Sequence, residues 1–332
     1  MDSAREGGSS GDGTSVVTGA FGFSGQQIAR RLLLRGEKVR TLTNHAQPGS
    51  PLYGRVQVAP LDFTDTRRLT ESMRGATVLY NTYWVRFSYG GLSHEYAVRN
   101  TKTLIQAAEA AGVKRIVHVS ITNPSIDSPL PYFKGKAELE QAIQSSSLSY
   151  AILRPAVLFG EGDVLINNIA FMLRRFPLFA IPGTGEYHVQ PIFVEDLAEL
   201  AVEGGQRSDS STVDAVGPET YTYTELVKMI GRAIGSKSLL VHLPAGLVRL
   251  ASGVLGAILK DVVLTENEIK GLMADLLVSH GPPTGRTNLE GWIKAHAGTI
   301  GATYASELAR HYVSGNPGSS SSTSSQLFFH PS

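Results

Sequence analysis

The first apolar segment of the chain is a short β-branched run at residues 15–18 (SVVT), with glycine close to both ends. Such a run predicts a buried strand. Residues 26–35 (QQIARRLLLR) then carry apolar side chains at helical spacing as far as Gly36, a residue that suits a helix C-terminus. Residues 39–43 (VRTLT) predict a second strand. These segments together predict a strand–helix–strand unit with a glycine-rich turn at the start of its helix.

Short apolar runs continue to alternate with longer helical patterns further along the chain. They predict a strand that ends at residues 61–63 and further strands at residues 78–81, 115–120 and 150–155. Asn100 opens a strongly helical stretch, where an asparagine is a typical helix cap. Strands that alternate with helices predict an α/β fold whose parallel sheet is doubly wound, with helices on both faces.

The pattern changes after residue 158. Residues 159–313 read as helices with few clear strands, which predicts a smaller, mostly helical C-terminal lobe with some strands returning to the main sheet. A helix is predicted to start at Thr222, with Glu225 in its first turn, where a negative charge suits the helix dipole.

The two ends of the chain differ from the rest. Residues 1–13 are polar and glycine-rich and lack the apolar run of a signal peptide. Residues 314–332 are rich in serine and glycine and hold too few apolar side chains to offset the cost of ordering. We expect a disordered leader and a disordered tail.

Composition excludes several classes of function. Of the 332 residues, 42% are hydrophobic and 18% are charged, as in an ordinary globular protein. The net charge of +1 gives no field that would attract nucleic acid, so we expect no nucleic-acid partner. The absence of cysteine excludes disulfides, iron–sulfur clusters, thiolate zinc sites and cysteine nucleophiles, and it is compatible with the cytoplasmic location that we expect. We expect no metal site.

The glycine-rich turn has the chemistry of a dinucleotide site. Gly19 permits a tight turn, Gly22 lets the backbone approach a pyrophosphate, and Gly25 lets the helix pack close to the strand. The helix N-terminus then offers free N–H groups and a positive dipole end to the phosphates. Phe21, Phe23 and Ser24 complete the predicted cofactor contacts of this turn.

The spacing T-G-x-x-G-x-x-G resembles the fingerprint of the extended and atypical short-chain dehydrogenases/reductases. The resemblance covers residues 14–200 well and the rest in outline. It implies an NAD(P)-binding Rossmann domain at residues 14–158, a substrate lobe at residues 159–313, and a strand at residues 213–216. Within the superfamily the chain is most similar to relatives of the 39-kDa-type accessory subunit of complex I. Epimerase/dehydratase-like and hydroxysteroid-dehydrogenase-like members come next.

The resemblance also implies residues around the adenosine half of the cofactor. Asp62, followed by Phe63, matches an aspartate that contacts adenine in the family, although a turn-forming aspartate is an equally simple interpretation. Asn81 matches the start of the family's N-A-A-G-type turn, but residues 82–84 depart from it. Asn44 stands where NAD-specific members carry an acid, and it suits either a ribose hydroxyl or an added phosphate. The sequence therefore leaves NAD and NADP both open.

Tyr132 and Lys136 form a Tyr-x-x-x-Lys pair, and residues four apart share one face of a helix. An adjacent ammonium stabilises a phenolate, which would make Tyr132 a usable general acid or base. In the family the lysine also binds the nicotinamide ribose. Thr122 is the favoured third catalytic hydroxyl by analogy with extended members, and Ser120 would then contact the cofactor; a strand-end serine that only satisfies backbone groups is the alternative.

Further candidate residues lie outside the glycine-rich turn and the Tyr132–Lys136 pair. Asn167 and Asn168 fall where related proteins place polar residues near the substrate, and Asp196 is expected to cap a helix. The aromatic residues within 80–89 are candidates for the wall of an apolar pocket, with plain core packing as the alternative. The apolar segment 244–260 is too short to cross a bilayer. We expect it to pack within the lobe or cap the site, with contact to a membrane surface or a protein as the alternative.

Two functions follow from these residues. In the first, an NAD(P)-dependent oxidoreductase or epimerase/dehydratase exchanges hydride at a carbonyl or hydroxyl carbon of a small molecule, such as a sugar nucleotide or a sterol. The intact Tyr132–Lys136 pair supports this interpretation. In the second, the dinucleotide has a structural or signalling role in a non-catalytic sensor or assembly subunit. The unusual turn at residues 81–84 and the apolar segment 244–260 support the second interpretation. The oligomeric state is left open.

Overall fold

A computed structural model of the protein describes residues 13–311. The expectations of a disordered leader (residues 1–13) and a disordered tail (residues 314–332) lie outside the described residues, Gly13 excepted.

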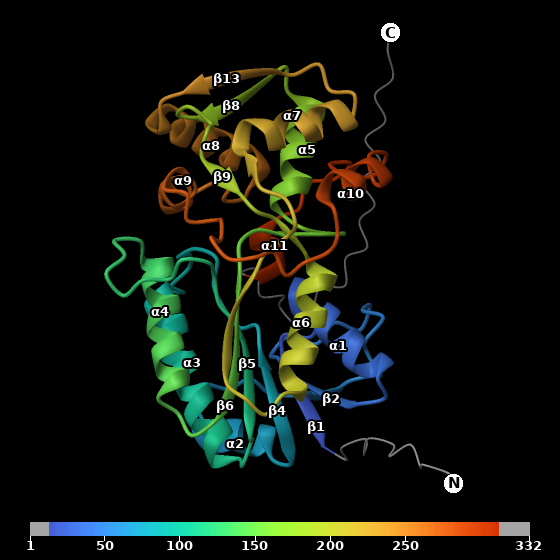
Figure 1. The fold of residues 1–332 in the computed structure, drawn as a ribbon, viewed down its shortest axis with the longest axis vertical. Helices are drawn as coiled ribbons and strands as arrows, with labels where there is room; N and C mark the ends of the chain where they lie inside the picture. The colour runs from blue at the N-terminus through green and yellow to red at the C-terminus, as the bar shows by residue number, and fades with distance from the viewer. Residues whose placement is uncertain (1–12, 312–332) are drawn as a thin grey trace.

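A seven-stranded parallel sheet forms the lower half of the molecule in Figure 1, with the strand order β11-β6-β5-β4-β1-β2-β3. The strands are β1 (Thr14–Thr18), β2 (Lys38–Leu42), β3 (Gln57–Ala59), β4 (Ala76–Asn81), β5 (Arg115–Val119), β6 (Ser149–Pro155) and β11 (Ser211–Ala215). The order reverses between β1 and β4, which is the switch point of a doubly wound sheet. The predicted Rossmann-type α/β fold is confirmed.

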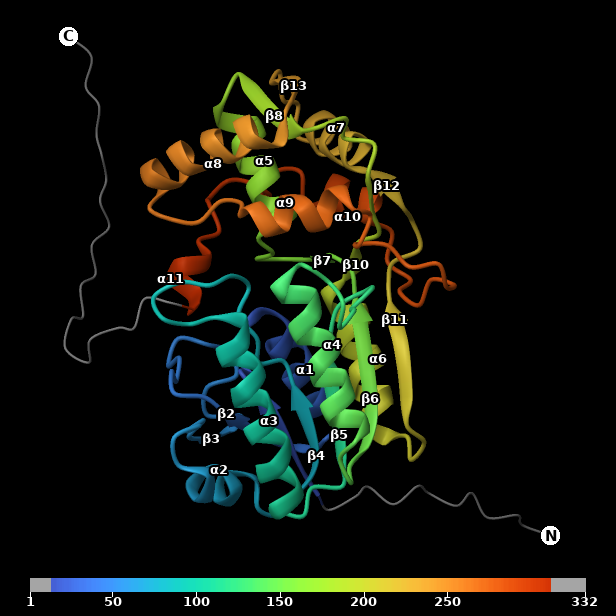
Figure 2. The same cartoon turned by 90° about the vertical axis from the view of Figure 1, so that its left-hand side faces the viewer.

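Helices cover both faces of the sheet (Figures 1 and 2). Helices α1 (Phe23–Leu34) and α6 (Val194–Gln206) pack against each other on one face. Helices α2 (Thr66–Met73), α3 (His94–Ala110) and α4 (Pro131–Gln144) lie on the other. Successive strand residues such as Val16 and Val17 belong to opposite cores, because side chains alternate along a strand.

A second part of the molecule, which we call the lobe, lies beyond the carboxyl ends of the strands (Figure 1). Its helices are α5 (Leu165–Arg175), α7 (Tyr223–Ala233), α8 (Ala245–Leu259), α9 (Glu266–Met273), α10 (Leu289–Ala295) and α11 (Glu307–His311). Its short strand pairs are β7 (Leu158–Phe159) with β10 (Ile192–Phe193), β8 (Leu178–Pro182) with β13 (Leu239–Leu243), and β9 (His188–Val189) with β12 (Tyr221–Thr222). The lobe has its own hydrophobic core, built largely from α5, α7 and α10.

The chain passes between the two parts three times. It leaves the sheet after β6 and builds the strands and helix from β7 to β10 in the lobe. It then returns with α6 and with β11, which pairs with β6 at the edge of the sheet. The rest of the described chain, from β12 onward, belongs to the lobe.

Local expectations have mixed outcomes. The predicted start at Thr222 is confirmed, because Thr222 and Glu225 form a reciprocal capping box on α7. The assignment of Asn100 is wrong, since α3 begins at His94 behind the cap Ser93 and Asn100 lies inside the helix.

Asp196 is not a helix cap either, because α6 begins behind Phe193. Its carboxylate instead accepts hydrogen bonds from the backbone N–H groups of Arg286 and Thr287 and from the Thr287 hydroxyl. Asp196 therefore ties the sheet-covering helix α6 to a distant loop that leads into α10.

No helix within residues 13–311 combines the length and the apolar character that crossing a membrane requires.

Candidate functional site

The turn from β1 into α1 has the geometry expected of a phosphate-binding loop. Gly19 has a φ of +66°, which favours glycine, and its carbonyl accepts a hydrogen bond of 2.8 Å from the Gly22 N–H. A Cβ atom on Gly25 would collide with the Gly19 carbonyl oxygen. The third glycine therefore lets the helix approach the turn closely.

The N-terminus of α1 is free to receive an anion. Gly22 is the capping residue, and no side chain within the described residues hydrogen-bonds to the first turn. Phe23 and Ser24 open the helix, and both are partly exposed, whereas Phe21 is buried in the core under the turn. Unpaired backbone N–H groups and the positive end of the helix dipole thus fit the pyrophosphate of a dinucleotide.

Asn44 and Asp62 lie on neighbouring loops beyond β2 and β3. The Asn44 side chain forms two hydrogen bonds with the backbone of Leu61, so it joins the loops. Asp62 accepts hydrogen bonds from the N–H and hydroxyl of Thr64, which is the turn-forming role considered above, and these bonds lower the pKa of its carboxyl. Both side chains therefore fix the backbone of the loops after β2 and β3, which would face the adenosine half of a bound dinucleotide.

Asn81 is fully buried at the end of β4 and its side chain is satisfied by the protein. Its Oδ1 accepts from the Thr18 hydroxyl and the Tyr83 N–H, and its Nδ2 lies 3.0 Å from Nδ1 of His118. The Thr18 hydroxyl oxygen in turn accepts from the N–H groups of Thr82 and Tyr83. The unusual turn that follows Asn81 is thereby fixed against β1.

Tyr132 and Lys136 lie on α4 as predicted, one helical turn apart. Lys136 Nζ donates a 2.7 Å hydrogen bond to the Val119 carbonyl and lies 4.4 Å from the centre of the Trp84 ring. Burial lowers the pKa of Lys136 to about 7. Burial also raises the pKa of Tyr132, and the charge of Glu268 adds to the effect. Lys136 is not among the charges that shift the pKa of Tyr132 here, so the role of the pair in acid–base chemistry stays a prediction.

Three aromatic side chains pack around the Tyr132 ring. The rings of Trp84, His94 and Phe133 lie 5.5, 5.6 and 5.7 Å from it, centre to centre. His94 Nε2 lies 3.3 Å from the Arg86 carbonyl oxygen, and burial lowers the pKa of the imidazole. The Trp84 indole N–H is buried and has no hydrogen-bond partner among the described residues.

The aromatic residues of the segment 80–89 do not form a single wall. Tyr80 is fully buried in the core of the sheet, while Tyr83 packs on Phe63 with ring centres 4.9 Å apart. Tyr89 is nearly half exposed. The tryptophan of this segment is the member that packs against Tyr132.

The two candidate hydroxyls both have internal partners. Ser120 donates a 2.5 Å hydrogen bond to the carboxylate of Glu140, which also receives a bidentate contact from Arg154. Thr122 is fully buried and donates a 2.7 Å hydrogen bond to the Leu276 carbonyl in the lobe. Thr122 and Ser120 therefore lie at the carboxyl end of β5, as predicted, but neither hydroxyl is free.

Three contacts join predicted residues from neighbouring loops: Asn44 with Leu61, Phe63 with Tyr83, and Trp84 with the Lys136 ammonium. The loops follow β2, β3 and β4, and Lys136 reaches the end of β5, so these contacts lie at the edge of the sheet where open α/β sheets bind ligands.

Several residues of this site were not predicted. Glu140 follows Lys136 by one helical turn, so the i,i+4 spacing carried a usable signal. His94 and Arg86 gave no such signal, because they reach the site through a loop whose path is set by contacts with the lobe. Lys134, between the paired Tyr132 and Lys136, is exposed. Asn167 and Asn168 bind the backbone of residues 301–305, so both are tied to a segment of the lobe.

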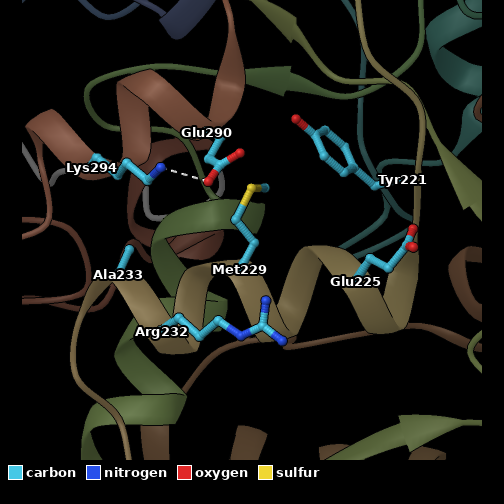
Figure 3. A pocket seen from close by; sticks show the side chains of 7 residues that line it. All are labelled: Tyr221, Glu225, Met229, Arg232, Ala233, Glu290 and Lys294. Atoms are coloured by element: carbon cyan, nitrogen blue, oxygen red, sulfur yellow. Dashed lines mark ion pairs between the residues drawn. The ribbon is translucent and has the colours of Figure 1, made fainter.

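Two cavities are open on the lobe. The larger, of about 630 Å³, lies between α8, α5 and β8 and is lined mainly by aliphatic side chains. The smaller, of about 420 Å³, lies between α7 and α10 and has four charged side chains in its lining; Figure 3 shows its Lys294–Glu290 ion pair. The smaller cavity contains none of the predicted site residues.

No group of three or more His, Cys, Asp or Glu side chains suitable for a metal ion occurs in residues 13–311.

The geometry defines a dinucleotide-binding α/β protein, and comparison with known proteins agrees. A family described as NAD(P)H-binding matches residues 19–168. The mitochondrial NADH-ubiquinone oxidoreductase 40 kDa subunit of Neurospora crassa is 28% identical over 274 residues, covering 80% of this chain and 72% of that protein. The photosystem II assembly factor Ycf39 of Guillardia theta is 24% identical over 308 residues, covering 86% of this chain and 94% of that protein.

Enzymes are also among the similar proteins. The ceramide reductase of Caulobacter vibrioides is 26% identical over 246 residues, covering 70% of this chain and 74% of that protein. The NADPH-dependent quinone oxidoreductase QOR2 of Escherichia coli, solved with NADPH, has a TM-score of 0.69 at 20% identity; the match covers 85% of this chain and 99% of that one. Residues 19–168 thus match an NAD(P)H-binding family, and the fold and the similar proteins fit the atypical short-chain dehydrogenases/reductases that the sequence resembles.

Proposed function

We propose that this protein is an NAD(P)-dependent reductase that adds hydride to a carbonyl carbon of a small molecule. The observation that carries the proposal is the pairing of Tyr132 and Lys136 on one face of α4, next to the carboxyl end of β5. The free N-terminus of α1 provides the place for the cofactor pyrophosphate. The turn and the Tyr–Lys pair stand on either side of the switch point between β1 and β4.

The residues divide the reaction into simple roles. When bound, a reduced nicotinamide supplies the hydride. Because burial raises the pKa of Tyr132, its phenol stays protonated at neutral pH and donates its proton to the carbonyl oxygen, which yields an alcohol. Lys136, which binds the Val119 carbonyl and lies against the Trp84 ring, would hold the ribose of a bound cofactor, and Trp84 would shield this side of the site from water.

The alternative is a non-catalytic dinucleotide-binding subunit. It is favoured by the internal bonds of the Ser120 and Thr122 hydroxyls and by the similarity to a respiratory complex subunit and an assembly factor. Both proposals require the nucleotide to bind. Only the first requires the protein to turn over a substrate with Tyr132 as the proton donor.

Titration of the purified protein with NADH and NADPH, followed by fluorescence, tests the binding step in wild type and in Gly22→Asp. An aspartate at this capping position favours the helix, so the variant should fold. Its carboxylate would occupy the place of the pyrophosphate, and we expect the affinity to fall at least tenfold. Gly22→Ser, a neutral cap, is the control. Equal affinity in wild type and Gly22→Asp would contradict the assignment of the turn.

Turnover of a panel of aldehydes and ketones in wild type and Tyr132→Phe then separates the two functions. The reductase proposal expects Tyr132→Phe to lose at least a hundredfold in kcat while nucleotide affinity stays within twofold. Nucleotide binding without turnover of any carbonyl, or turnover that survives Tyr132→Phe, favours the non-catalytic alternative or another proton donor.

A further inference from the structure

The larger cavity of the lobe is an open apolar groove. We call it the α8 groove and define it by α8 on one side and by α5 and β8 on the other. Only Val248 and Gly256 of α8 are buried. Leu247, Val254 and Ile258 line the groove, yet they are 51%, 60% and 70% exposed. The expected packing of the segment 244–260 into the lobe is therefore incomplete, and a volume of about 630 Å³ stands open behind the helix.

The spacing of the exposed residues shows that they share one side of the helix. Leu247, Val254 and Ile258 are separated by seven and four residues, which places them on one face. The exposed residues Arg249 and Ala257 do not line the groove. The apolar stripe of α8 thus borders the open groove, while its one charged side chain, Arg249, lies outside the lining.

Arg86 belongs both to the lining of the groove and to the surroundings of Tyr132. Arg86 and Asn168 are polar residues of the lining. The Arg86 Nε group binds Glu268 at 2.6 Å, and the buried Nη1 group lies 4.0 Å from the Glu307 carboxylate, with no hydrogen-bond partner in the described residues. The charges of Arg86 and Glu268 both act on Tyr132, and His94 touches both the Arg86 carbonyl and the Tyr132 ring.

We propose that the α8 groove binds the hydrocarbon chain of the substrate, whose carbonyl head lies near Arg86 and Tyr132. The inference rests on the proposed reductase function and names its substrate class: an aldehyde or ketone with a long aliphatic chain. A small-molecule site of this size is normally a mainly apolar cavity with a few polar groups that fix orientation. The lining fits a chain better than a sugar, because a sugar would leave most of its hydroxyl groups without partners.

The test uses unreactive ligands first, so that binding does not depend on turnover. Calorimetric titration of the full-length protein with hexanamide, nonanamide and dodecanamide measures affinity against chain length. Each CH₂ buried in an apolar site is expected to raise affinity roughly threefold to fourfold. An affinity that does not rise from six to twelve carbons overturns the proposal.

Val254→Glu places a carboxylate in the groove and should abolish the gain in affinity with chain length. Ala257→Glu is the matched control, since it puts the same charge on the same helix at an exposed position outside the groove lining. We expect Ala257→Glu to bind dodecanamide within twofold of wild type. Equal chain-length dependence in Val254→Glu, or a wild-type dimer that Val254→Glu converts to a monomer, overturns the proposal; the second result makes the groove an interface between copies.

Turnover of hexanal, nonanal and dodecanal distinguishes this proposal from the reductase function. A rising kcat/KM with chain length in wild type and Ala257→Glu, but not in Val254→Glu, supports both. Turnover of short carbonyls without chain dependence leaves the reductase function intact and overturns the groove assignment. Amide binding with chain dependence but no aldehyde turnover supports the groove and contradicts the reductase.

Discussion

Burial, rather than a neighbouring charge, determines the protonation of the two side chains on which the proposed chemistry depends. Burial raises the pKa of Tyr132, so its phenol is neutral at pH 7, and burial lowers the pKa of Lys136 to about 7. A neutral phenol suits the donation of a proton and therefore the direction of reduction. With a pKa of about 7, the Lys136 side chain is only partly charged at neutral pH, and a bound cofactor anion would favour its charged form.

This property of Lys136 predicts a pH dependence of nucleotide binding. The cofactor diphosphate favours the ammonium, so the pKa of Lys136 should be higher in the complex than its free value of about 7. Below pH 7 the lysine is charged in both states, and affinity is constant. As pH rises above 7 the free protein must take up a proton to bind, so affinity should fall by up to tenfold per pH unit until the pKa of the complex is reached.

Titration of NADH or NADPH between pH 6 and pH 9 in wild type and Lys136→Met measures this effect. The variant should bind more weakly at pH 6, and its affinity should change little over the range. A wild-type affinity that is flat, or that rises with pH, would show that the Lys136 ammonium does not contact the cofactor.

At the scale of single side chains, the sequence predicted positions better than partners. Tyr132 and Lys136 lie one turn apart near the start of α4, and Ser120 directly follows β5, as the spacing of residues predicted. The bond from Thr122 to Leu276 joins residues more than 150 positions apart. No local pattern carries that information, because it depends on how the lobe packs against the sheet.

At the scale of elements, the close contact between α1 and the turn before it depends on Gly25, which has no side chain. Gly25→Ala would place a methyl group against the Gly19 carbonyl, which is backbone and cannot turn away. We expect a loss of about 1–3 kcal/mol in the free energy of unfolding, the usual cost of overpacking. Urea denaturation measures it.

Gly253→Ala is the matched control for this change. Gly253 is also helical, but a Cβ atom there meets nothing within 4 Å. The substitution should leave stability unchanged or raise it by up to about 1 kcal/mol, because alanine has the higher helix propensity. A loss of stability in both variants would point to a general effect of replacing glycine in these helices and not to the α1 contact.

The alternation of strands and helices was predictable, because short apolar runs indicate buried strands and apolar residues at a spacing of 3.6 indicate helices. The start of α3 was not, because its first turn is polar and its cap Ser93 follows an irregular loop. The environment of α8 was also beyond the sequence. An apolar helix has the same sequence pattern whether it is buried in a core or borders an open groove. Its burial depends on which elements pack against it in the folded protein.

At the scale of the whole molecule, Asp196 is a point where the sheet and the lobe are held together. Asp196→Ala would leave two backbone N–H groups, those of Arg286 and Thr287, without their acceptor. We expect the free energy of unfolding to fall by about 2–3 kcal/mol, because hydrogen bonds to charged groups are among the stronger ones.

Urea denaturation of Asp196→Ala, Asp196→Asn and Glu203→Ala provides the measurement. The asparagine variant keeps an acceptor and should lose about half as much, while Glu203, exposed on the same helix, should change stability by less than about 0.5 kcal/mol. If Asp196→Ala and Glu203→Ala have the same free energy of unfolding, the hydrogen bonds of Asp196 do not help to hold the sheet and the lobe together.

The threefold passage of the chain between the sheet and the lobe has a consequence for protein engineering. Neither part is a single stretch of sequence, since α6 and β11 interrupt the lobe and complete the sheet. Grafting the lobe of a relative onto this sheet would need two inserts and three junctions, chosen after β6, before α6 and after β11. A single proteolytic cut in any one of these connections would leave the two halves joined by the other two crossings.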